Sequence, residues 1–284
     1  MDLTWDLYNP ASRAGRILVV APSIGGNCSH QWAKVAELLT SDARVVFVDY
    51  PGHALSEVWN DEDEPTLDVV ASAIMDVVHE VREQVGELPV FFAGLSIGGA
   101  TGLHLARDHA DELAGVAVLC SAATVGEPDR WFERAELVET SGTQQLLEET
   151  SKRWFTPAFK AANPRVTTTI MEGLAAADDH SYAQLCRCLA HHDLRADLRD
   201  IRCPLLLIAG ERDSSTPIAN QELVAASVPG AQLSVIPEAA HQVTVAAPDT
   251  TANLLRAFMD RVTLNQIGRA CVGKECRSRW SPYH

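Results

Sequence analysis

The strongest constraint on the fold is a series of short apolar runs that alternate with stretches of helical periodicity. Six runs of four or five residues, rich in Val, Ile and Leu, are Ile17–Ala21, Val45–Val48, Val90–Ala93, Val116–Leu119, Leu205–Ala209 and Leu233–Ile236. Helical patterns are found at His30–Leu39, Leu67–Val85, Ala100–His109 and Ile218–Ser227. Runs that are apolar on both faces are typical of strands in a buried parallel sheet. The alternation therefore predicts an α/β fold, with a mostly parallel, twisted sheet and helices on both faces.

The alternation stops between residues 123 and 196. Four helical segments occupy this stretch without a strand-like run between them: Glu127–Thr140, Thr143–Trp154, Pro164–Ala177 and Ser181–His191. A helical insertion between two parts of a parallel sheet is typical of a cap, although a plain run of packed helices is the alternative. We expect a core at residues 1–122 and 197–262, a helical cap at residues 123–196, and a disordered or vector-derived tail at residues 263–284.

Composition and charge exclude several functional classes. The 284 residues carry a formal net charge of −15, which repels phosphate backbones, so nucleic acid is not expected as a partner. No apolar run approaches the roughly 18 residues of a membrane span. The N-terminal MDLTWDLYNP lacks the features of a signal peptide, which favours the cytoplasm. The seven cysteines are odd in number and irregularly spaced, which predicts free or buried thiols rather than disulfides or a zinc site.

The segment that says most about chemistry is Gly94-Leu-Ser-Ile-Gly98, a G-x-S-x-G motif between an apolar run and a helical pattern. This context is that of a sharp strand–turn–helix elbow, which exposes a serine at the end of a sheet. Gly94 and Gly98 lack Cβ atoms, so the strand and the helix can approach closely. We interpret Ser96 as a nucleophile, the alternative being an ordinary glycine-rich turn.

A serine nucleophile requires two donors for the oxyanion that forms in the reaction. One is expected to be the backbone N–H that follows the nucleophile, that of Ile97. The second is expected to come from the loop after an earlier strand, here Ala21-Pro-Ser-Ile-Gly-Gly-Asn27, with Ile24 as the donor. A simple glycine turn is the other interpretation of that loop.

The base and its orienting acid are expected in the chain order Ser, Asp or Glu, His. His241 follows the last apolar run by five residues, which would bring an imidazole to the same sheet edge; a solvated loop histidine is the alternative. Asp213 follows the run Leu205–Ala209 and is the preferred acid, with Glu211 as its rival. Such a Ser–His–Asp arrangement hydrolyses esters through an acyl-enzyme and requires no metal or cofactor.

These residues resemble the α/β-hydrolase family. Asp49-Tyr-Pro-Gly-His-Ala-Leu-Ser56 is similar to the family's D-x-x-G-H-G-x-S loop, with Ala54 in place of the second glycine. A narrower resemblance, to the enol-lactonases of the β-ketoadipate pathway, covers about residues 10–262. The segments that carry it are Ser121-Ala-Ala-Thr124, Trp131, Arg134, Arg153-Trp-Phe-Thr-Pro-Ala-Phe159, Tyr182-Ala183, Asp193-Leu-Arg195 and Gly210…Asp213…Thr216-Pro217. The resemblance implies hydrolysis of 3-oxoadipate enol-lactone to 3-oxoadipate in the cytoplasmic breakdown of protocatechuate and catechol.

The chain departs from the enol-lactonase pattern in two places. His241-Gln-Val-Thr244 replaces a His-Leu-Ser-Asn-like segment, and Leu189-Ala-His-His-Asp193 stands where an arginine or an acid is expected. The enol-lactone carries a carboxylate, which an acidic protein must hold with a local cation. Arg134 lies one helical turn from Trp131 and is the preferred ligand of that carboxylate.

Other cap residues offer alternatives at this stage. Arg130 and Arg153 are weaker candidates for the carboxylate, and Trp154 is expected to line the substrate site with Trp131. A solvated arginine above a cap core of the two tryptophans is the other interpretation.

Two other functions stay open from the sequence. One is a general carboxylesterase or perhydrolase-like enzyme acting on a small ester. Another is a ligand-binding protein that keeps the three residues of the triad. Displacement at an epoxide or a halide requires an acidic nucleophile at the elbow, where this chain has Ser96. The expected partner is a small lactone or ester, and a homo-oligomer is compatible with the sequence.

Overall fold

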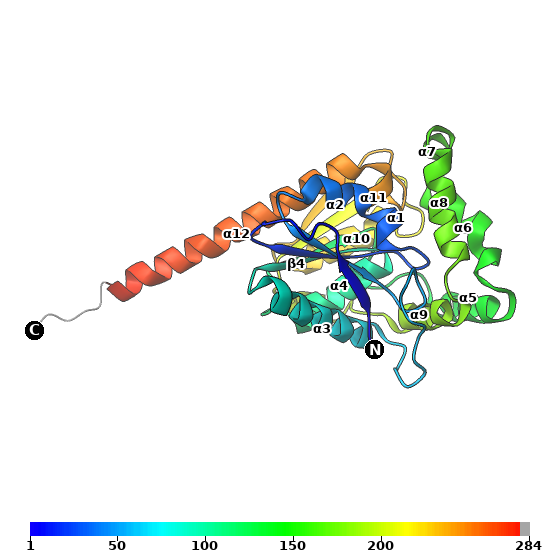
Figure 1. The fold of residues 1–284 in the computed structure, drawn as a ribbon, viewed down its shortest axis with the longest axis horizontal. Coiled ribbons are helices and arrows are strands. Elements are labelled where there is room, and N and C mark those ends of the chain that lie inside the picture. The colour runs from blue at the N-terminus through cyan, green and yellow to red at the C-terminus, as the bar shows by residue number, and fades with distance from the viewer. Residues whose placement is uncertain (279–284) are drawn as a thin grey trace, which may run out of the picture.

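The computed structural model describes residues 1–278, and it describes side chains for residues 1–265. Within that range seven strands form one sheet in the order β1-β3-β2-β4-β5-β6-β7 (Figure 1). The strands are β1 (Thr4–Leu7), β2 (Ile17–Ala21), β3 (Arg44–Asp49), β4 (Val90–Leu95), β5 (Gly115–Leu119), β6 (Leu205–Gly210) and β7 (Gln232–Ile236). Only β1 is antiparallel to its neighbour; the other pairs are parallel. The expected α/β architecture is confirmed.

The six apolar runs all become strands, and the additional strand lies at the edge of the sheet. β1 has only four residues, and its burial alternates between exposed and half-buried positions. An edge strand of this kind has no continuous apolar run, because one of its faces is open to solvent. This is why the sequence pattern did not reveal β1.

Helices cover both faces of the sheet, as the apolar pattern predicted. One face is covered by α3 (Leu67–Val85), α4 (Ile97–Asp108) and α10 (Ile218–Ser227). The other face is covered by α1 (Cys28–Gln31), α2 (Ala33–Leu39), α11 (Val243–Ala246) and α12 (Pro248–Ser278). Within β2, Val19 belongs to the first of these cores and Val20 to the second, since successive side chains of a strand point to opposite faces. Both cores are therefore built from the same strands.

The connection between β5 and β6 consists of helices joined by loops and adds no strand to the sheet. It contains α5 (Pro128–Ser141), a short 3₁₀ turn at Thr143–Leu146, α6 (Leu147–Trp154), α7 (Pro157–Ala162), α8 (Pro164–Ala175), α9 (Asp179–His191) and a second 3₁₀ turn at Leu198–Asp200. Figure 1 shows these helices, in green, grouped at one end of the sheet. Both ends of the group meet, because Thr124 and Asp193 form an antiparallel bridge and Leu194 N–H donates to the Ala123 carbonyl at 2.8 Å.

The C-terminal segment differs from the expected tail. α12 continues as a helix through Ser278, so residues 263–278 are helical where disorder was expected, and residues 279–284 lie outside the described residues. The stretch lacks an apolar period but contains good helix formers such as Gln266, Arg269 and Ala270, so local propensity favours a helix there. Among the helices of the described residues, none has both the length and the apolar character of a membrane span.

The strand order decides where a site can form. The chain moves from β2 to β3 in one direction and then crosses to β4 on the other side of β2. At such a switch point the loops that follow the two adjacent strands diverge and leave a crevice at the carboxyl edge of the sheet. Here these are the loop after β2 and the turn after β4, which carry Ile24 and Ser96.

Candidate active site

Ser96 occupies a sharp turn between β4 and α4. Its backbone has φ 60° and ψ −116°, a conformation that L-residues rarely adopt. The turn requires glycine on both sides of the serine, because a Cβ on Gly94 would lie 2.0 Å from the Gly98 backbone, and one on Gly98 would lie 2.8 Å from the Ala21 carbonyl oxygen. The N–H of Ser96 donates to the Leu119 carbonyl at 2.8 Å and so anchors the turn to β5.

His241 and Asp213 form a buried pair beside this turn. His241 Nδ1 lies 2.8 Å from Asp213 Oδ2, and the two residues are 3% and 6% exposed. They follow β7 and β6, whose carboxyl ends lie at the same sheet edge as the end of β4. Within the described part of the chain the Ser96 hydroxyl makes no hydrogen bond, although Ser96 and His241 line one cavity.

The Asp213 carboxylate is held by four donors. The N–H groups of Ser215 and Thr216 donate to Oδ1 at 2.8 and 3.1 Å, and the Thr216 hydroxyl donates to Oδ2 at 2.7 Å. Burial by itself raises the pKa of Asp213, but the charge of His241 and the hydrogen bonds from His241 and Thr216 outweigh burial and lower it. The carboxylate therefore stays ionised and orients Nδ1–H of His241 toward itself, which leaves Nε2 as the basic nitrogen.

The rival acid lies elsewhere. Glu211 Oε2 accepts the N–H of Glu238 at 3.0 Å, and Glu211 is exposed. The structure therefore brings Asp213, and not Glu211, to the imidazole of His241. The two residues are separated by one turn of the same loop, which is why the sequence left both open.

The loop after β2 pairs several of its backbone N–H groups within the protein and leaves that of Ile24 without an acceptor among the described residues. Ser23 N–H donates to Gln31 Oε1, Gly25 N–H to His53 Nε2 and Gly26 N–H to the Ser23 carbonyl, each at 2.9 Å. In the same loop, and among the hydrogen bonds of the described residues, the N–H of Ile24 donates to no acceptor; the N–H of Ile97 at the start of α4 is likewise without one. Ile24 also lines the cavity that contains Ser96. This is the arrangement that an oxyanion hole requires.

His53 is a neutral acceptor within this loop system. Its Nδ1 lies 2.8 Å from the Pro51 carbonyl, so Nδ1 carries the proton and Nε2 accepts from Gly25. Burial lowers the pKa of His53, which keeps the ring neutral. The next residue, Ala54, has φ 51°, which explains why a glycine is common at this place in similar loops.

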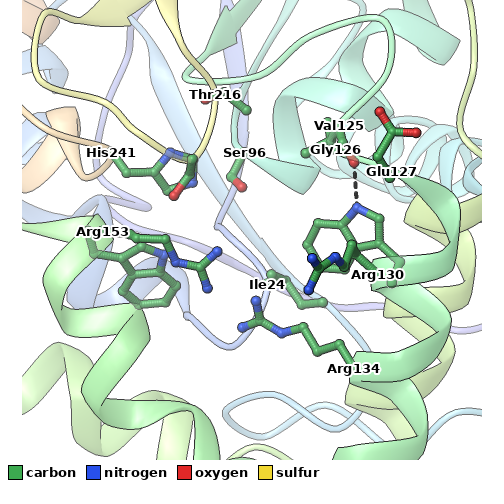
Figure 2. A pocket seen from close by; sticks show the side chains of 13 residues that line it. Ile24, Ser96, Val125, Gly126, Glu127, Arg130, Arg134, Arg153, Thr216 and His241 are labelled. Atoms are coloured by element: carbon green, nitrogen blue, oxygen red, sulfur yellow. Dashed lines mark hydrogen bonds between the residues drawn. The ribbon is translucent and has the colours of Figure 1, made fainter.

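A cavity of about 370 Å³ opens over Ser96 between the sheet edge and the cap (Figure 2). Its walls are formed by residues from both parts: Ile24, Ser96, Val125, Gly126, Glu127, Arg130, Trp131, Arg134, Arg153, Trp154, Ser215, Thr216 and His241. The volume suits a small ligand. The cap thus completes a site whose reactive groups come from the sheet edge.

Two arginines enter the cavity from opposite sides of the cap. In Figure 2 the guanidinium groups of Arg134, on α5, and Arg153, on α6, extend into the same space. Among the residues whose side chains are described, neither forms a salt bridge. Burial and the neighbouring charge of Arg134 lower the pKa of Arg153. Two guanidinium groups without a carboxylate partner among the described side chains give this end of the cavity a positive charge.

The remaining cap residues fix the position of Arg134. Its guanidinium lies 5.5 Å from the ring centres of Trp131 and Tyr182 and donates to the Tyr182 hydroxyl. The Trp131 indole N–H donates to the Val125 carbonyl, as the dashed line in Figure 2 shows. Trp154, at the end of α6, also lines the cavity and is 5% exposed. By contrast, Arg130 projects largely into solvent and pairs with Glu133 at 3.9 Å.

One group of potential metal ligands occurs in the described residues, and it overlaps the buried pair. Cys120, Asp213 and His241 have ligand atoms within 4.8 Å of one another. Burial and the charge of Asp213 raise the pKa of the Cys120 thiol well above its usual value, and Asp213 and His241 are hydrogen-bonded to each other. The five cysteines with described side chains, Cys28, Cys120, Cys186, Cys188 and Cys203, are free and buried, as the sequence predicted. Cys271 and Cys276 lie outside the residues whose side chains are described.

Several residues around the site were not identified as functional from the sequence. Thr216 contributes a hydroxyl to Asp213, and its only signal was the Thr216-Pro217 pair in the resemblance. Gln31 and Gln242 both contact Ser23 in the loop that carries Ile24. Glutamine carries no chemical signature of its own, and these contacts span up to 219 residues, so no local pattern could have revealed them.

Known proteins share this fold and up to about a third of the aligned residues. The model of the Alpha/beta hydrolase family matches residues 18–254. The chain is 30% identical over 231 residues to 3-oxoadipate enol-lactonase 1 of Acinetobacter baylyi, covering 81% of this chain and 84% of that protein. It is 28% identical over 217 residues to a pimeloyl-[acyl-carrier protein] methyl ester esterase of Chromobacterium violaceum, covering 74% and 81%.

Solved structures agree with these similarities. The crystal structure of the enol-lactonase from Burkholderia xenovorans LB400 superimposes with a TM-score of 0.83 at 27% identity, covering 91% of this chain and 96% of that one. The resemblance to α/β-hydrolases, and among them to enol-lactonases, is thereby confirmed. The chain belongs to the alpha/beta hydrolase family and is a hydrolytic enzyme.

Proposed function

We propose that this protein is a serine hydrolase that opens a small carboxylated enol-lactone, converting 3-oxoadipate enol-lactone to 3-oxoadipate in cytoplasmic aromatic catabolism. The observation that carries the proposal is the cavity over Ser96, which combines a reactive end at His241 with an anion-binding end at Arg134 and Arg153. The similarity to enol-lactonases supports the same substrate class. Neither end alone would specify a charged lactone.

The first half of the reaction forms an acyl-enzyme. His241 Nε2 takes the hydroxyl proton of Ser96 while Oγ attacks the lactone carbonyl, and Asp213 stabilises the imidazolium through Nδ1–H. The N–H groups of Ile24 and Ile97 bind the oxyanion. The ring C–O bond then breaks, the enol oxygen leaves with the proton held by His241, and the enol tautomerises to a ketone. An enol is a good leaving group, so this step places modest demands on the triad.

The second half releases the product. Water enters the cavity, His241 takes one of its protons, and the resulting hydroxide attacks the acyl carbonyl. Collapse of the second tetrahedral intermediate returns the proton to Ser96 and forms a new carboxylate. One water is consumed, and a monoanionic lactone becomes a dicarboxylate and a proton. Arg134 and Arg153 hold the original carboxylate throughout, which keeps the cleaved chain in one orientation.

The test compares a carboxylated enol-lactone with p-nitrophenyl acetate. We expect the wild type to turn over the lactone at least tenfold more efficiently, and Ser96→Ala to abolish both activities and labelling by a fluorophosphonate. A hydrogen bond to a charged group contributes about 1.5–3 kcal/mol, so Arg134→Ala should raise KM for the lactone roughly 10- to 100-fold and leave the ester almost unchanged. Arg187→Ala removes a cap arginine that pairs with Glu139 outside the cavity and serves as the control. Equal effects of Arg134→Ala on both substrates would contradict the carboxylate role.

A neutral ester is the second candidate substrate. The cavity walls include Ile24, Val125, Trp131 and Trp154, which suit an apolar acyl chain. The similarity to a methyl ester esterase points the same way. A preference for p-nitrophenyl butyrate over the lactone, unaffected by Arg134→Ala, would favour this candidate.

A further inference from the structure

The loop that carries Ile24 is clamped by two buried glutamines. Gln31 makes two contacts with Ser23: its Oε1 accepts the Ser23 N–H at 2.9 Å, and its Nε2 donates to the Ser23 hydroxyl at 2.7 Å. Gln242 Nε2 donates to the same hydroxyl at 3.1 Å. All three residues are at most 2% exposed. Ser23 therefore lies at the centre of a polar network inside an otherwise apolar region.

Gln242 connects three parts of the molecule. It directly follows His241 in the chain, and its side chain contacts the loop of Ser23. Its backbone N–H donates to the carbonyl of Trp154 in the cap at 3.3 Å. Its carbonyl accepts the N–H of Ala246, the last residue of α11, at 2.8 Å. The base, the oxyanion loop and the cap thus meet at one residue.

A buried amide at this place disfavours folding unless it is fully paired. Within the described residues Gln242 Oε1 has no hydrogen-bond partner, and an unpaired buried acceptor costs about 1–3 kcal/mol. A methionine of similar size would fill the same space without that penalty. A gain in stability therefore does not explain the contact of Gln242 Nε2 with Ser23. The contact is better explained by a role in holding the Ser23 loop in place.

We propose that Gln242 is a positioning residue that, through Ser23, fixes the distance between the oxyanion hole at Ile24 and the base His241. The inference rests on the proposed function, because it assumes that both groups act on one reacting carbonyl. The N–H of Ile24 must meet the oxygen where negative charge develops, while His241 Nε2 must face the attacking oxygen a few ångströms away. A direct link between the two loops holds these groups in register.

The expected effect is on the transition state and not on substrate binding. A displaced oxyanion donor weakens an interaction that is strong only when the carbonyl has become tetrahedral. Gln242→Met keeps the volume and removes the amide, so we expect kcat to fall about tenfold or more while KM changes less than twofold. Affinity for a boronic acid, which mimics the tetrahedral state, should fall by the same factor as kcat/KM. Affinity for a planar carboxylate inhibitor should not change.

The chain provides a matched control. Gln221 on α10 is also fully buried, and its Nε2 also makes one hydrogen bond, to the Ile208 carbonyl at 3.2 Å, with Oε1 unpaired among the described residues. Gln221→Met should change stability about as much as Gln242→Met and leave kcat unchanged. A merely structural role for Gln242 predicts the same kinetics for both variants, and that result would overturn the proposal.

Ser23→Ala supplies a second arm. If Gln242 acts through Ser23, the double variant Ser23→Ala/Gln242→Met should lose no more kcat than the more damaged single variant; additive losses would overturn the proposal.

Amide hydrogen exchange of residues 23–31 tests the contact between Gln242 and Ser23 without turnover. It should accelerate in Gln242→Met and not in Gln221→Met, and unchanged exchange would also overturn the proposal. Kinetics on p-nitrophenyl acetate separate the proposed substrate from the proposed role of Gln242. If the wild type cleaves this ester but no enol-lactone, the proposed substrate is wrong. The effect of Gln242→Met can still be measured on the ester.

Discussion

Replacement of Asp213 by asparagine should reverse the proton position on His241. Both oxygens of Asp213 are committed: Oδ1 accepts the backbone N–H groups of Ser215 and Thr216, and Oδ2 accepts from the Thr216 hydroxyl and His241 Nδ1. In Asp213→Asn the amide oxygen must stay opposite the two backbone donors, which leaves the amide NH₂ facing His241. An N–H donor there selects the imidazole tautomer with its lone pair on Nδ1 and its proton on Nε2.

That tautomer cannot accept the proton of Ser96. The reaction then retains only the contributions of the oxyanion hole and of substrate binding, so kcat should fall about 10³- to 10⁴-fold, equivalent to roughly 4–5.5 kcal/mol of activation free energy. KM should change little, since Asp213 contacts no substrate. The side-chain volume is conserved, so the protein should fold and the midpoint of thermal unfolding serves as the check.

The assay measures kcat and KM on the enol-lactone and on p-nitrophenyl acetate, together with the rate of fluorophosphonate labelling. Glu211→Gln is the matched control, because Glu211 follows the same strand and accepts a hydrogen bond from Glu238 N–H but does not reach His241. We expect its kcat within about twofold of the wild type. The reasoning would be refuted if Asp213→Asn kept more than a tenth of the wild-type kcat, or if Glu211→Gln lost as much.

Two further predictions concern stability. Gly94→Ala should lower the free energy of unfolding by about 3 kcal/mol or more, because its Cβ would meet the Gly98 backbone at 2.0 Å. Urea denaturation measures this loss, and Gly15→Ala is the control, because a Cβ on Gly15 would meet nothing within 4 Å. Equal losses in the two variants would contradict the steric argument. Burial lowers the pKa of His192 to about 4, so the folded state disfavours its protonation. The unfolded chain binds this proton from about pH 6.5 downward, so the free energy of unfolding should decline between pH 6.5 and 4, by up to about 3 kcal/mol. His192→Asn should flatten that decline, and identical pH profiles for both proteins would count against this assignment.

The pattern of the sequence determined most of the elements. Runs apolar on both faces predicted the five inner strands β2 to β6, because only a strand buried on both sides excludes polar residues from both faces. A sixth, less regular run predicted the edge strand β7. α3 begins and ends where the periodicity predicted, at Leu67 and Val85, between Thr66 as its N-cap and Gly86 with φ 92°. By contrast, the edge strand β1 and the helix α12 were missed, since a half-exposed element leaves a weaker apolar pattern.

The chemical candidates were also readable from the sequence. The G-x-S-x-G motif and the chain order of Ser96, Asp213 and His241 depend on local turns at strand ends, and a sheet brings strand ends together whatever its detailed packing. For this reason the structure places all three at one edge. The sequence favoured Asp213 but kept Glu211 as a rival, because both follow β6 and only the orientation of the loop shows which one reaches the imidazole.

What only the tertiary structure decided is how the cap and the loops complete the site. The sequence named Arg134 and ranked Arg153 below it, whereas the fold brings both guanidinium groups into one cavity from helices α5 and α6. Ser23 and Gln242 are 219 residues apart and meet only because β2 and β7 end at the same side of the sheet. Periodicity and motifs report on which residues are buried and which chemistry is present nearby in the chain. Contacts between distant loops depend on the packing of the whole molecule, and so the register between base, oxyanion hole and anion site is a property of the fold.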